Sequence, residues 1–384
     1  MKLVKREKSP RLQLVGGHEE ITAEDERRFW AIATTELTTA QQQLVSQPTQ
    51  VFPHQESVLA VHWHPEFVPM ELIRARITAL YPKSHEELII PTQHNRINAY
   101  DDYCGVEVDC YSRGFQRKVQ LLLHFHHDRL SRTRVLQGAL EHTFQYRTSQ
   151  FFDLVRTFTK PNTERLDQAA RATGVDHDVI SLVREQAAKL EILVERHYDN
   201  MHPDIIKNRL LRNFLGTLNG VYDRKTINRA HIFLSQVKNI VKAEFSPDYF
   251  YRTSEIIEEA RGIGAGVVVP HPEEFWPILL AEYDVDGYEV WNPQSREYTD
   301  FLISVLVNKN RRRDRQQRPL LLFMGDDTHM SAKIRPPEEQ KVSKGLREIG
   351  YQPPWDDLNL RKKLIMTQMD RLTLIQEYKA RLAS

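Results

Sequence analysis

The sequence predicts an α/β fold, a barrel of parallel strands interrupted by a long helical insertion. Seven short apolar runs have the pattern of strands, and helical patterns lie between several of them, which is typical of a parallel sheet. From about residue 134 to residue 261 the pattern is continuously helical, with no strand-like run. A chain of 384 residues can hold one large barrel with such an insertion.

The barrel is predicted in two parts that flank the insertion. A capping box at Thr22 to Asp25 predicts a helix near the N-terminus. The predicted strands are 58–62, 88–91, 105–108, 119–123, 266–269, 287–290 and 320–324. The predicted regions are an N-terminal tail and helix 1–56, a first barrel part 57–133, the insertion 134–261, a second barrel part 262–335 and a C-terminal helical tail 336–384. We expect the insertion to be a lid or specificity subdomain and the tail to pack on the barrel exterior.

The composition excludes several classes of protein. Lys and Arg number 53 against 52 Asp and Glu, a net charge of +1, which argues against a globally basic nucleic-acid binder and a polybasic membrane-surface protein. No apolar stretch approaches the ~18 residues of a membrane span, so we expect a cytoplasmic protein. Cys104 and Cys110 are too few for a disulfide framework and are expected to be reduced. The basic run 310–318 is interpreted as a solvated helix end before the last strand, in preference to a nucleic-acid contact.

Potential metal ligands directly follow the first and the last predicted strand. His62 and His64 end the first, and Asp327 and His329 end the last. Residues i and i+2 of a strand share a face, so each pair directs two donors to one place. The strands of an α/β barrel carry their chemistry at their C-terminal ends. The two pairs therefore predict a metal site.

Three further residues occupy similar positions in the strands between. His94 follows the second predicted strand, Glu107 lies in the third, and His271 follows the fifth. Imidazoles together with carboxylates suit Zn, Mn or Fe, and a carboxylate can bridge two ions. A site with more than one ion is therefore plausible.

The order of these motifs resembles that of the polymerase and histidinol phosphatase (PHP) family of metal-dependent phosphoesterases, over about residues 57–335. The matching segments are His62-Trp63-His64, Thr92-Gln93-His94, Gly105-Val106-Glu107, Pro270-His271-Pro272, Asp286 to Asn292 and Gly325 to His329. Two positions depart from the family pattern. Gln93 replaces an Asp, and Pro69 and Met70 stand where many members carry an acid or a His, so Glu66 is the nearest replacement.

The resemblance implies a distorted (β/α)7 TIM-like barrel with the helical insertion between strands 4 and 5. It also implies two or three divalent ions, Mn, Zn or Fe. The implied ligands are His62, His64, His94, Glu107, His126, His271, Asp327 and His329. Glu107 would bridge two ions, and Glu107, His271 and Asp327 would act in catalysis through a metal-activated water. For the fourth strand His126 fits the family position best, with His124 as the fallback.

The function expected from this resemblance is hydrolysis of a phosphate ester. Arg113 and Lys333 lie near the ends of strands three and seven and are candidate phosphate-binding residues. A small phosphorylated substrate is expected in preference to nucleic acid, and the oligomeric state is left open. The alternatives are a nuclease or phosphodiesterase, an amidohydrolase-like enzyme for C–N bonds, and a scaffold whose metals only stabilise the fold. The usual carboxylated Lys of an amidohydrolase is not apparent, which favours the phosphoesterase.

Overall fold

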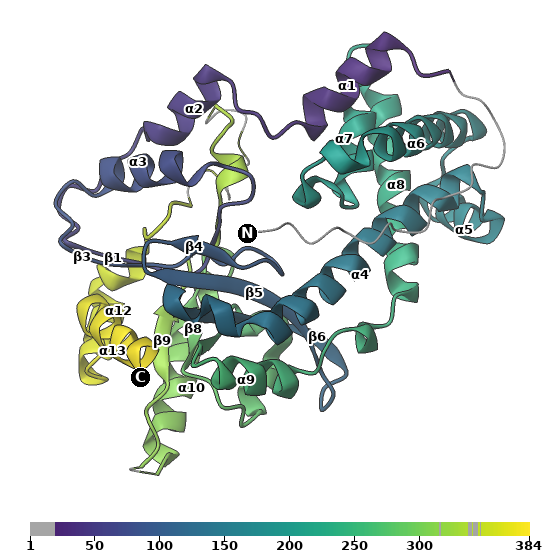
Figure 1. Cartoon of the computed structure of the whole chain (residues 1–384). Coiled ribbons are helices and arrows are strands. Elements are labelled where there is room, and N and C mark those ends of the chain that lie inside the picture. The colour runs from purple at the N-terminus through teal and green to yellow at the C-terminus, as the bar shows by residue number, and fades with distance from the viewer. Residues whose placement is uncertain (1–19, 315, 337–339, 341–344, 346) are drawn as a thin grey trace. The chain divides into compact units, whose positions relative to one another are not determined.

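The structure is a computed structural model, and it describes residues 20–314, 316–336, 340, 345 and 347–384 (Figure 1). The chain divides into two compact units. The first comprises residues 1–34 and 151–243, and the second comprises residues 35–150 and 244–384. We describe each unit by itself.

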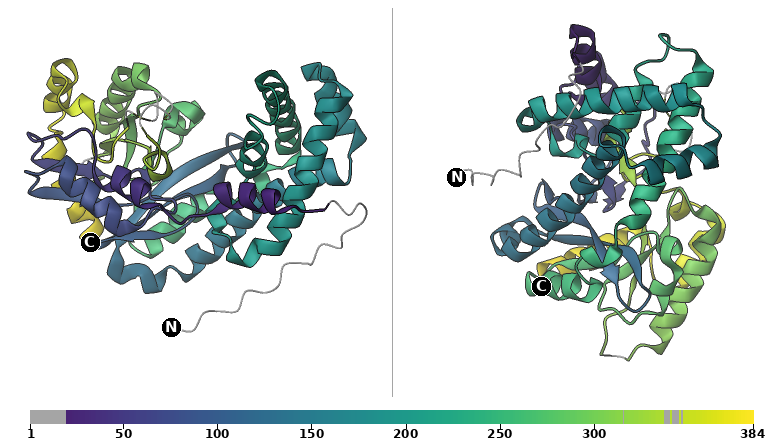
Figure 2. Two further views of the ribbon diagram at one scale, coloured as in Figure 1. Left: turned by 90° about the horizontal axis from the view of Figure 1, so that it is seen from above. Right: turned by 90° about the vertical axis from the view of Figure 1, so that its right-hand side faces the viewer.

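The first unit is helical in its described part (Figure 2). Its helices are α1 (Ala23–Ala33), α5 (Thr163–Thr173), α6 (His177–His197) and α7 (Arg209–Gly216), together with most of α8 (Arg224–Glu244) and the C-terminal part of α4 (Arg134–Thr159). The capping box predicted for α1 is confirmed, because Thr22 accepts the Asp25 N–H and Asp25 accepts the Thr22 N–H. None of the described helices has the length and apolar character to cross a membrane.

The second unit combines helices and strands. Its helices are α2 (Thr39–Ser46), α3 (Met70–Leu80), α9 (Thr253–Gly262), α10 (Thr299–Arg312), α12 (Leu358–Met366) and α13 (Arg371–Ala383), with the 3₁₀ helices η1 (His127–Arg132) and η5 (Pro272–Leu280). Its strands are β1 (Ser57–Ala60), β2 (Trp63–His64), β3 (Glu86–Ile89), β4 (Asn98–Tyr100), β5 (Tyr103–Ser112), β6 (Arg117–His126), β7 (Gly266–Val269), β8 (Gly287–Trp291), β9 (Leu321–Met324) and β10 (Thr328–His329). All seven predicted strands are present, as β1, β3 and β5 to β9.

The fold is mixed α/β, with parallel and antiparallel pairs. β1 pairs with β3 and β2 with β10, both in parallel. The largest sheet has the order β4-β5-β6-β7-β8-β9, in which the pairs from β4 to β7 are antiparallel and the pairs from β7 to β9 are parallel. The prediction of an all-parallel sheet is wrong for β5 and β6. Only residues 113–116 join them, and so short a connection makes a hairpin, whereas a parallel crossover needs a dozen residues or more.

A few hydrogen bonds connect the three sheets around the strand ends. The Glu107 N–H in β5 donates to Gln93 O at 3.1 Å, and the Asp327 N–H donates to His62 O at 2.9 Å. The Gln352 side chain reaches both Leu59 O in β1 and Met324 O in β9, at 2.8 Å each. No closed barrel is assigned over the part of the chain that the structure describes.

The C-terminal tail does more than cover the outside of the second unit. Gln352 is fully buried between β1 and β9, and its Oε1 accepts the indole N–H of Trp355 at 2.7 Å. Tyr378 of α13 is also fully buried, and its hydroxyl lies 2.7 Å from His124 Nδ1 of β6. The tail therefore packs on the strands, as expected, and also places polar side chains between them. Since β1 and β9 do not pair with each other, Gln352 supplies the hydrogen bonds that join them.

Two glycines permit close approaches that position the site. A Cβ on Gly105 of β5 would lie 2.4 Å from Pro91 O, so glycine lets the segment after β3 approach β5. A Cβ on Gly325 would lie 2.2 Å from Oε1 of Glu289, so glycine leaves room for this carboxylate. Both approaches bring chain segments of the site together.

Candidate metal centre

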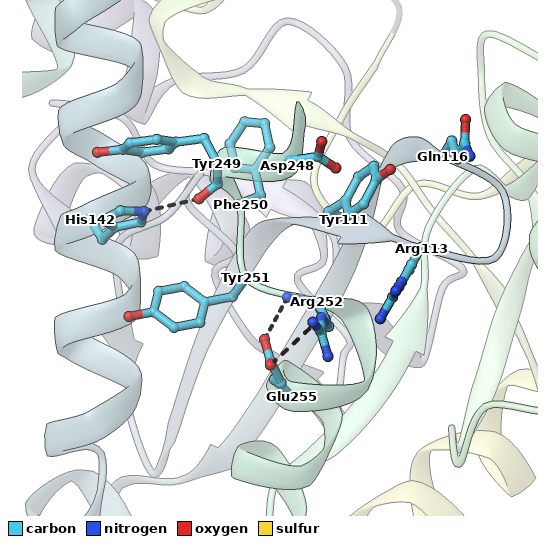
Figure 3. A pocket seen from close by; sticks show the side chains of 10 residues that line it. All are labelled: Tyr111, Arg113, Gln116, His142, Asp248, Tyr249, Phe250, Tyr251, Arg252 and Glu255. Carbon is cyan, nitrogen blue, oxygen red and sulfur yellow. Dashed lines mark hydrogen bonds and ion pairs between the residues drawn. The ribbon is translucent and has the colours of Figure 1, made fainter. Parts of the chain in front are cut away.

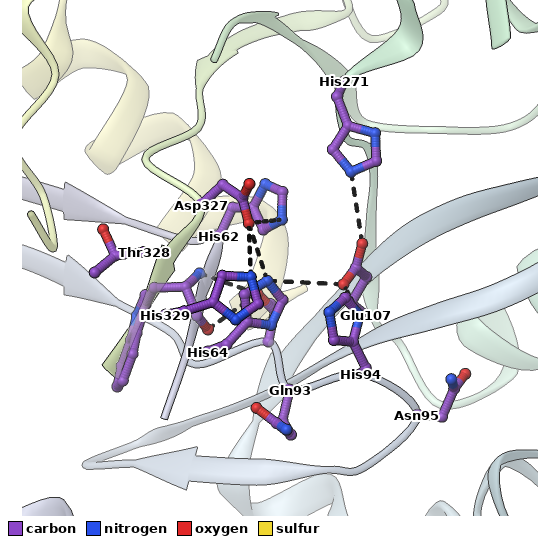
Figure 4. Close-up of polar contacts among 12 residues, drawn as sticks. His62, His64, Gln93, His94, Asn95, Glu107, His271, Asp327, Thr328 and His329 are labelled. Atoms are coloured by element: carbon purple, nitrogen blue, oxygen red, sulfur yellow. Dashed lines mark hydrogen bonds and ion pairs between the residues drawn. The ribbon is translucent and has the colours of Figure 1, made fainter. Parts of the chain in front are cut away.

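Seven of the eight predicted ligands converge at the ends of the strands, and we call them the histidine cluster (Figure 4). They are His62, His64, His94, Glu107, His271, Asp327 and His329. His64 lies in β2, Glu107 in β5 and His329 in β10, and the others occupy the loops that follow β1, β3, β7 and β9. Most of these side chains are buried, and only His94 and His329 are partly exposed.

The separations between imidazoles and carboxylates match the spacing of ligands around an ion. Asp327 Oδ1 lies 3.3 Å from His64 Nε2, 3.5 Å from His329 Nε2 and 3.8 Å from His62 Nε2. Glu107 Oε1 lies 3.6 Å from His271 Nε2. These distances mostly exceed a hydrogen bond. Two donors at about 2.1 Å from one ion, at a tetrahedral angle, stand about 3.4 Å apart.

Buried ring nitrogens in the cluster have no hydrogen-bond partner among the described residues. This holds for Nε2 of His62 and for both ring nitrogens of His64. Buried polar atoms of this kind are costly unless something satisfies them. Two sets of donors lie close enough to hold an ion, one with His64, His94 and His329 and the other with His62, His64 and Glu107. Because they share His64, the two sets adjoin, and the donors are of the types that divalent metal ions bind.

A carboxylate lies behind three of the histidines. His62 Nδ1 is 2.6 Å from Oε1 of Glu289, while His62 Nε2 faces the cluster. His271 has Glu274 at 3.7 Å from its Nδ1. His329 has Glu66 at 3.5 Å from its Nδ1. A carboxylate on the far ring nitrogen fixes the tautomer and orientation of a metal-binding histidine.

Sequence reasoning missed Glu289 as a partner of the site, although the motif from Asp286 to Asn292 contains it. Glu289 is buried, and its Oε2 accepts the His271 N–H at 3.0 Å. It therefore connects two residues of the cluster that follow different strands. An acidic residue inside an apolar strand was the available signal.

Two side chains hold Asp327, and both were missed as well. Arg347 Nη1 donates to Asp327 Oδ2 at 2.6 Å and to Asp327 O at 2.9 Å. Gln294 Nε2 donates to the same Oδ2 at 2.7 Å. Since these donors occupy Oδ2, Oδ1 is the oxygen that faces the histidines. No local sequence pattern marks Arg347, which lies 20 residues further along the chain.

The cluster has strongly perturbed proton affinities. Burial raises the pKa of Glu107 and Asp327, but the surrounding histidines outweigh it and hold both well below the usual range. Burial and the nearby His329 and His94 lower the pKa of His64 to about 3. For His62 burial is outweighed by Glu289, which raises the pKa to about 10. The carboxylates are thus ionised and His64 is neutral at pH 7, as metal ligands must be, whereas His62 must lose a proton to bind an ion.

Strained backbone marks the same region. Four of the seven positive-φ non-glycine residues in the described chain lie here: Glu66, Asn95, His271 and Asp327, with φ of 53°, 52°, 27° and 45°. Left-handed backbone is costly for residues other than glycine and persists where the surrounding structure imposes it. All four residues belong to the cluster or adjoin it in sequence or space.

The structure does not bring the fourth-strand histidines into the cluster. His126 is 40 % exposed, and its Nδ1 lies 3.1 Å from Asp128. His124 is buried, but Tyr378 at 2.7 Å and Val61 O at 2.9 Å occupy its two nitrogens. β6 ends at His126 and runs antiparallel to β5, so its end lies beside the start of β5 and away from Glu107.

The two predicted phosphate-binding residues also lie elsewhere. Lys333 is buried, 3.3 Å from Oε2 of Glu348, and its ammonium donates to Gly345 O at 3.2 Å. Arg113 is exposed in the β5–β6 turn, where it lines a separate cavity (Figure 3). Neither residue is among the contacts of the histidine cluster.

The structure shows where the two departures from the family pattern lie. Pro69 precedes α3, and Met70 is the first residue of that helix. Glu66, the proposed replacement, does approach the cluster, through His329. Gln93 accepts the Glu66 N–H at 3.1 Å and therefore supports the first loop.

Comparisons with known proteins add little. No protein-family model matches the chain, and no curated protein matches it at a significant level. A solved structure from Bifidobacterium adolescentis, named as a candidate metal-dependent phosphoesterase, is similar with a TM-score of 0.39 and 17% identity, over 86% of this chain and 93% of that one. An amidohydrolase from Chromobacterium violaceum, with bound sulfate and no metal, has a TM-score of 0.39 and 14% identity, over 80% of this chain and 97% of that one. Because both scores are low, function is inferred below from the side chains alone.

Proposed function

We propose that the protein is a metal-dependent phosphoesterase that hydrolyses a phosphate ester. The observation that carries this proposal is the convergence of five imidazoles and two carboxylates, with unsatisfied nitrogens directed to one place. Divalent ions bound there supply Lewis acidity, which acidifies water and neutralises charge on phosphate oxygens. Mn, Zn and Fe suit this mixture of donors.

The proposed ligands are the seven residues of the histidine cluster. Glu107 is the proposed bridge between two ions, since its Oε1 faces His271 and its Oε2 faces His64 and His94. Asp327 contributes Oδ1 only, because Arg347 and Gln294 occupy its other oxygen. Glu66 could complete a third site beside His329. Two ions are therefore proposed, and a third position would involve Glu66.

The protein's own residues orient and charge this site. Glu289 holds the His62 ring with Nε2 toward the cluster and ties it to the His271 backbone. The ionised Glu107 and Asp327 balance the positive charge of bound ions. No side chain near the cluster is needed as a nucleophile, since Cys104 and Cys110 are buried in the core and burial raises the pKa of both thiols.

A distorted barrel is the proposed arrangement of the strands. β1 and β3 pair directly, and the segment after β3 bonds to β5. The series continues through the large sheet to β9, and Gln352 joins β9 back to β1. Seven strands would then surround the core, and the histidine cluster would lie at one end of this barrel, mostly in the loops that follow the strands.

The test is removal and return of the metal. We expect the purified chain to contain divalent metal, to lose hydrolysis of p-nitrophenyl phosphate on chelation, and to regain it with Mn²⁺. Elemental analysis should give about two ions per chain. Hydrolysis that persists in excess chelator would overturn the proposal.

A substrate panel separates the proposed activity from the alternatives. A small phosphomonoester should be hydrolysed faster than a phosphodiester, single-stranded DNA or a cyclic amide. A preference for the amide would identify a hydrolase of C–N bonds with the same ions. Tight metal binding without hydrolysis of any class would favour a scaffold.

A further inference from the structure

A second cavity, apart from the histidine cluster, lies at the end of the β5–β6 hairpin (Figure 3). Its volume is about 510 Å³, within the range of small-molecule sites. It belongs to the second unit, and its walls are the segments 111–116 and 248–255 with His142 of α4. Tyr111 lies four residues after Glu107 on β5, about 13 Å along the strand.

Hydrogen bonds hold the walls of this cavity in place. The Tyr111 N–H donates to Tyr251 O at 2.8 Å, which joins β5 to the segment before α9. His142 Nε2 lies 2.9 Å from Tyr249 O and fixes α4 to the same segment. A site formed in advance loses little conformational entropy when a ligand binds.

Aromatic rings form much of the lining and remain accessible. Tyr249 and Tyr251 are 40 % and 42 % exposed, although each contacts the His142 ring. Their hydroxyls can donate hydrogen bonds, whereas the Tyr111 hydroxyl already donates to Asp248. Exposed rings grouped around a cavity suit a planar ligand, which can stack on them.

Two arginines and two acids, Asp248 and Glu255, line the cavity, and the arginines are the groups that can bind an anion. The side chains of Arg113 and Arg252 extend from opposite walls toward the same space (Figure 3). No ion pair of Arg113 is present in the described part of the chain, and Arg252 Nε is 4.0 Å from Glu255. Two guanidinium groups in one cavity repel each other unless an anion lies between them.

The acids of the cavity are already engaged. Glu255 accepts the Arg252 backbone N–H at 2.9 Å as part of the α9 cap. Asp248 is hydrogen-bonded to Tyr111, an interaction that raises the pKa of the tyrosine. The hydrogen-bonding groups that remain available in the cavity are therefore mostly donors. Among them, guanidinium groups bind phosphate and carboxylate well.

We propose that this cavity binds a ligand that joins an anionic group to a planar ring, with a nucleoside monophosphate as the chemical type. The phosphate lies between Arg113 and Arg252, and the ring lies against Tyr111, which is on the same side of the cavity as the two arginines (Figure 3). This site does not depend on metal in the histidine cluster. Its ligand is either a free nucleotide or the phosphorylated end of a single strand.

The test measures binding of AMP to the full chain by calorimetry, with chelator present so that the metal centre does not contribute. AMP should bind at least ten-fold more tightly than adenosine or inorganic phosphate alone. Arg113→Gln and Arg252→Gln should each weaken AMP at least ten-fold. Arg117→Gln is the matched control, an exposed arginine at the start of β6 outside the cavity, and should change nothing.

The outcomes are distinct. A 5′-phosphorylated single-stranded octamer that binds more tightly than AMP identifies a strand end, and one that binds more weakly identifies a free nucleotide. AMP that binds no better than adenosine, or equally well to the Arg113→Gln variant, overturns the proposal. Arg113 lies in an exposed turn, so thermal unfolding of that variant should match the wild type.

Discussion

Two groups of charged side chains are buried in the second unit, and they differ in how their polar atoms are satisfied. The first is the histidine cluster. The second, which we call the Glu348 cluster, consists of Arg76, Lys333 and Glu348, each 4 to 6 % exposed. Both contain ionised groups away from water, where each charge needs a partner.

The Glu348 cluster satisfies itself. Arg76 Nε donates to Oε1 of Glu348 at 2.8 Å, and Nη2 donates to its Oε2 at 2.5 Å. Arg76 also donates to Val45 O at 2.8 Å, and Lys333 lies 3.3 Å from Oε2 of Glu348. A bidentate ion pair together with backbone carbonyl acceptors uses most of the N–H donors of Arg76.

The histidine cluster leaves nitrogens without partners and places Asp327 Oδ1 at 3.3 to 3.8 Å from three imidazoles, although His94 directly contacts Glu107. The contrast teaches that burial of charge alone does not mark a functional site. A structural cluster closes its hydrogen bonds within the protein, whereas a cluster built for an ion leaves them open.

Removal of a cluster ligand should have the largest effect. We expect His64→Asn to lower hydrolysis of p-nitrophenyl phosphate by about 10³-fold or more and to lower bound metal, because His64 belongs to both sets of donors. The metal-free variant should unfold within about 1–2 kcal/mol of the metal-free wild type, since neither ring nitrogen loses a hydrogen bond. Metal analysis and urea unfolding check the two halves. Full metal content in the variant would contradict the assignment.

Disruption of the Glu348 cluster should act on stability instead. Arg76→Met leaves Glu348 with Lys333 as its remaining charged partner, and we expect a loss of about 3–5 kcal/mol in the free energy of unfolding. Arg74→Met is the matched control on the same helix, since its ion pair with Asp101 is half-exposed and contributes about 1 kcal/mol or less. Urea unfolding measures both. Equal losses for the two variants would remove the distinction between the clusters.

A smaller effect is expected from the carboxylates that contact the far ring nitrogens of the histidines, and Glu289 can be compared with Glu274. Glu289→Gln should weaken Mn²⁺ binding by about 10- to 100-fold, because it frees the His62 ring to turn. Glu274→Gln should have less effect, since Glu274 is 55% exposed and 3.7 Å from His271. Titration of the metal-free protein with Mn²⁺ measures both. An unaffected Glu289→Gln variant would exclude the orienting role.

The smallest expected effect is on the pH dependence of stability, and it arises from the Glu348 cluster. Burial raises the pKa of Glu348, but Arg76 and Lys333 outweigh it and lower the pKa below 4.5. A carboxyl with a depressed pKa in the folded state contributes stability above its unfolded pKa, and loses it as pH falls through the folded value. The difference in unfolding free energy between wild type and Glu348→Gln should therefore shrink below about pH 4.5. A constant difference from pH 7 to pH 3 would contradict this.

Much of the site could be predicted from local pattern. His62 with His64, and Asp327 with His329, were expected to share a face because they follow strands with a spacing of two, and the structure places all four together. Glu107 was expected from its place within the third predicted strand and from the resemblance. Its buried position in β5 agrees with a strand that is apolar on both sides.

The fourth strand shows where local pattern stops. The spacing of His124 and His126 predicts a shared face, and the strand includes both. However, the tight turn between β5 and β6 reverses the strand, so its end points away from Glu107. Strand direction depends on pairing with a distant segment, which periodicity does not report.

The sequence by itself determined the positions of the seven strands and the residue types at their ends, because strand geometry is local and repeats every two residues. Only the tertiary structure decided which donors meet and what holds them. Glu289 reaches His62 across 227 residues, and Arg347 reaches Asp327 from a tail expected to lie outside. Such contacts depend on which faces pack together, and packing is a property of the whole chain.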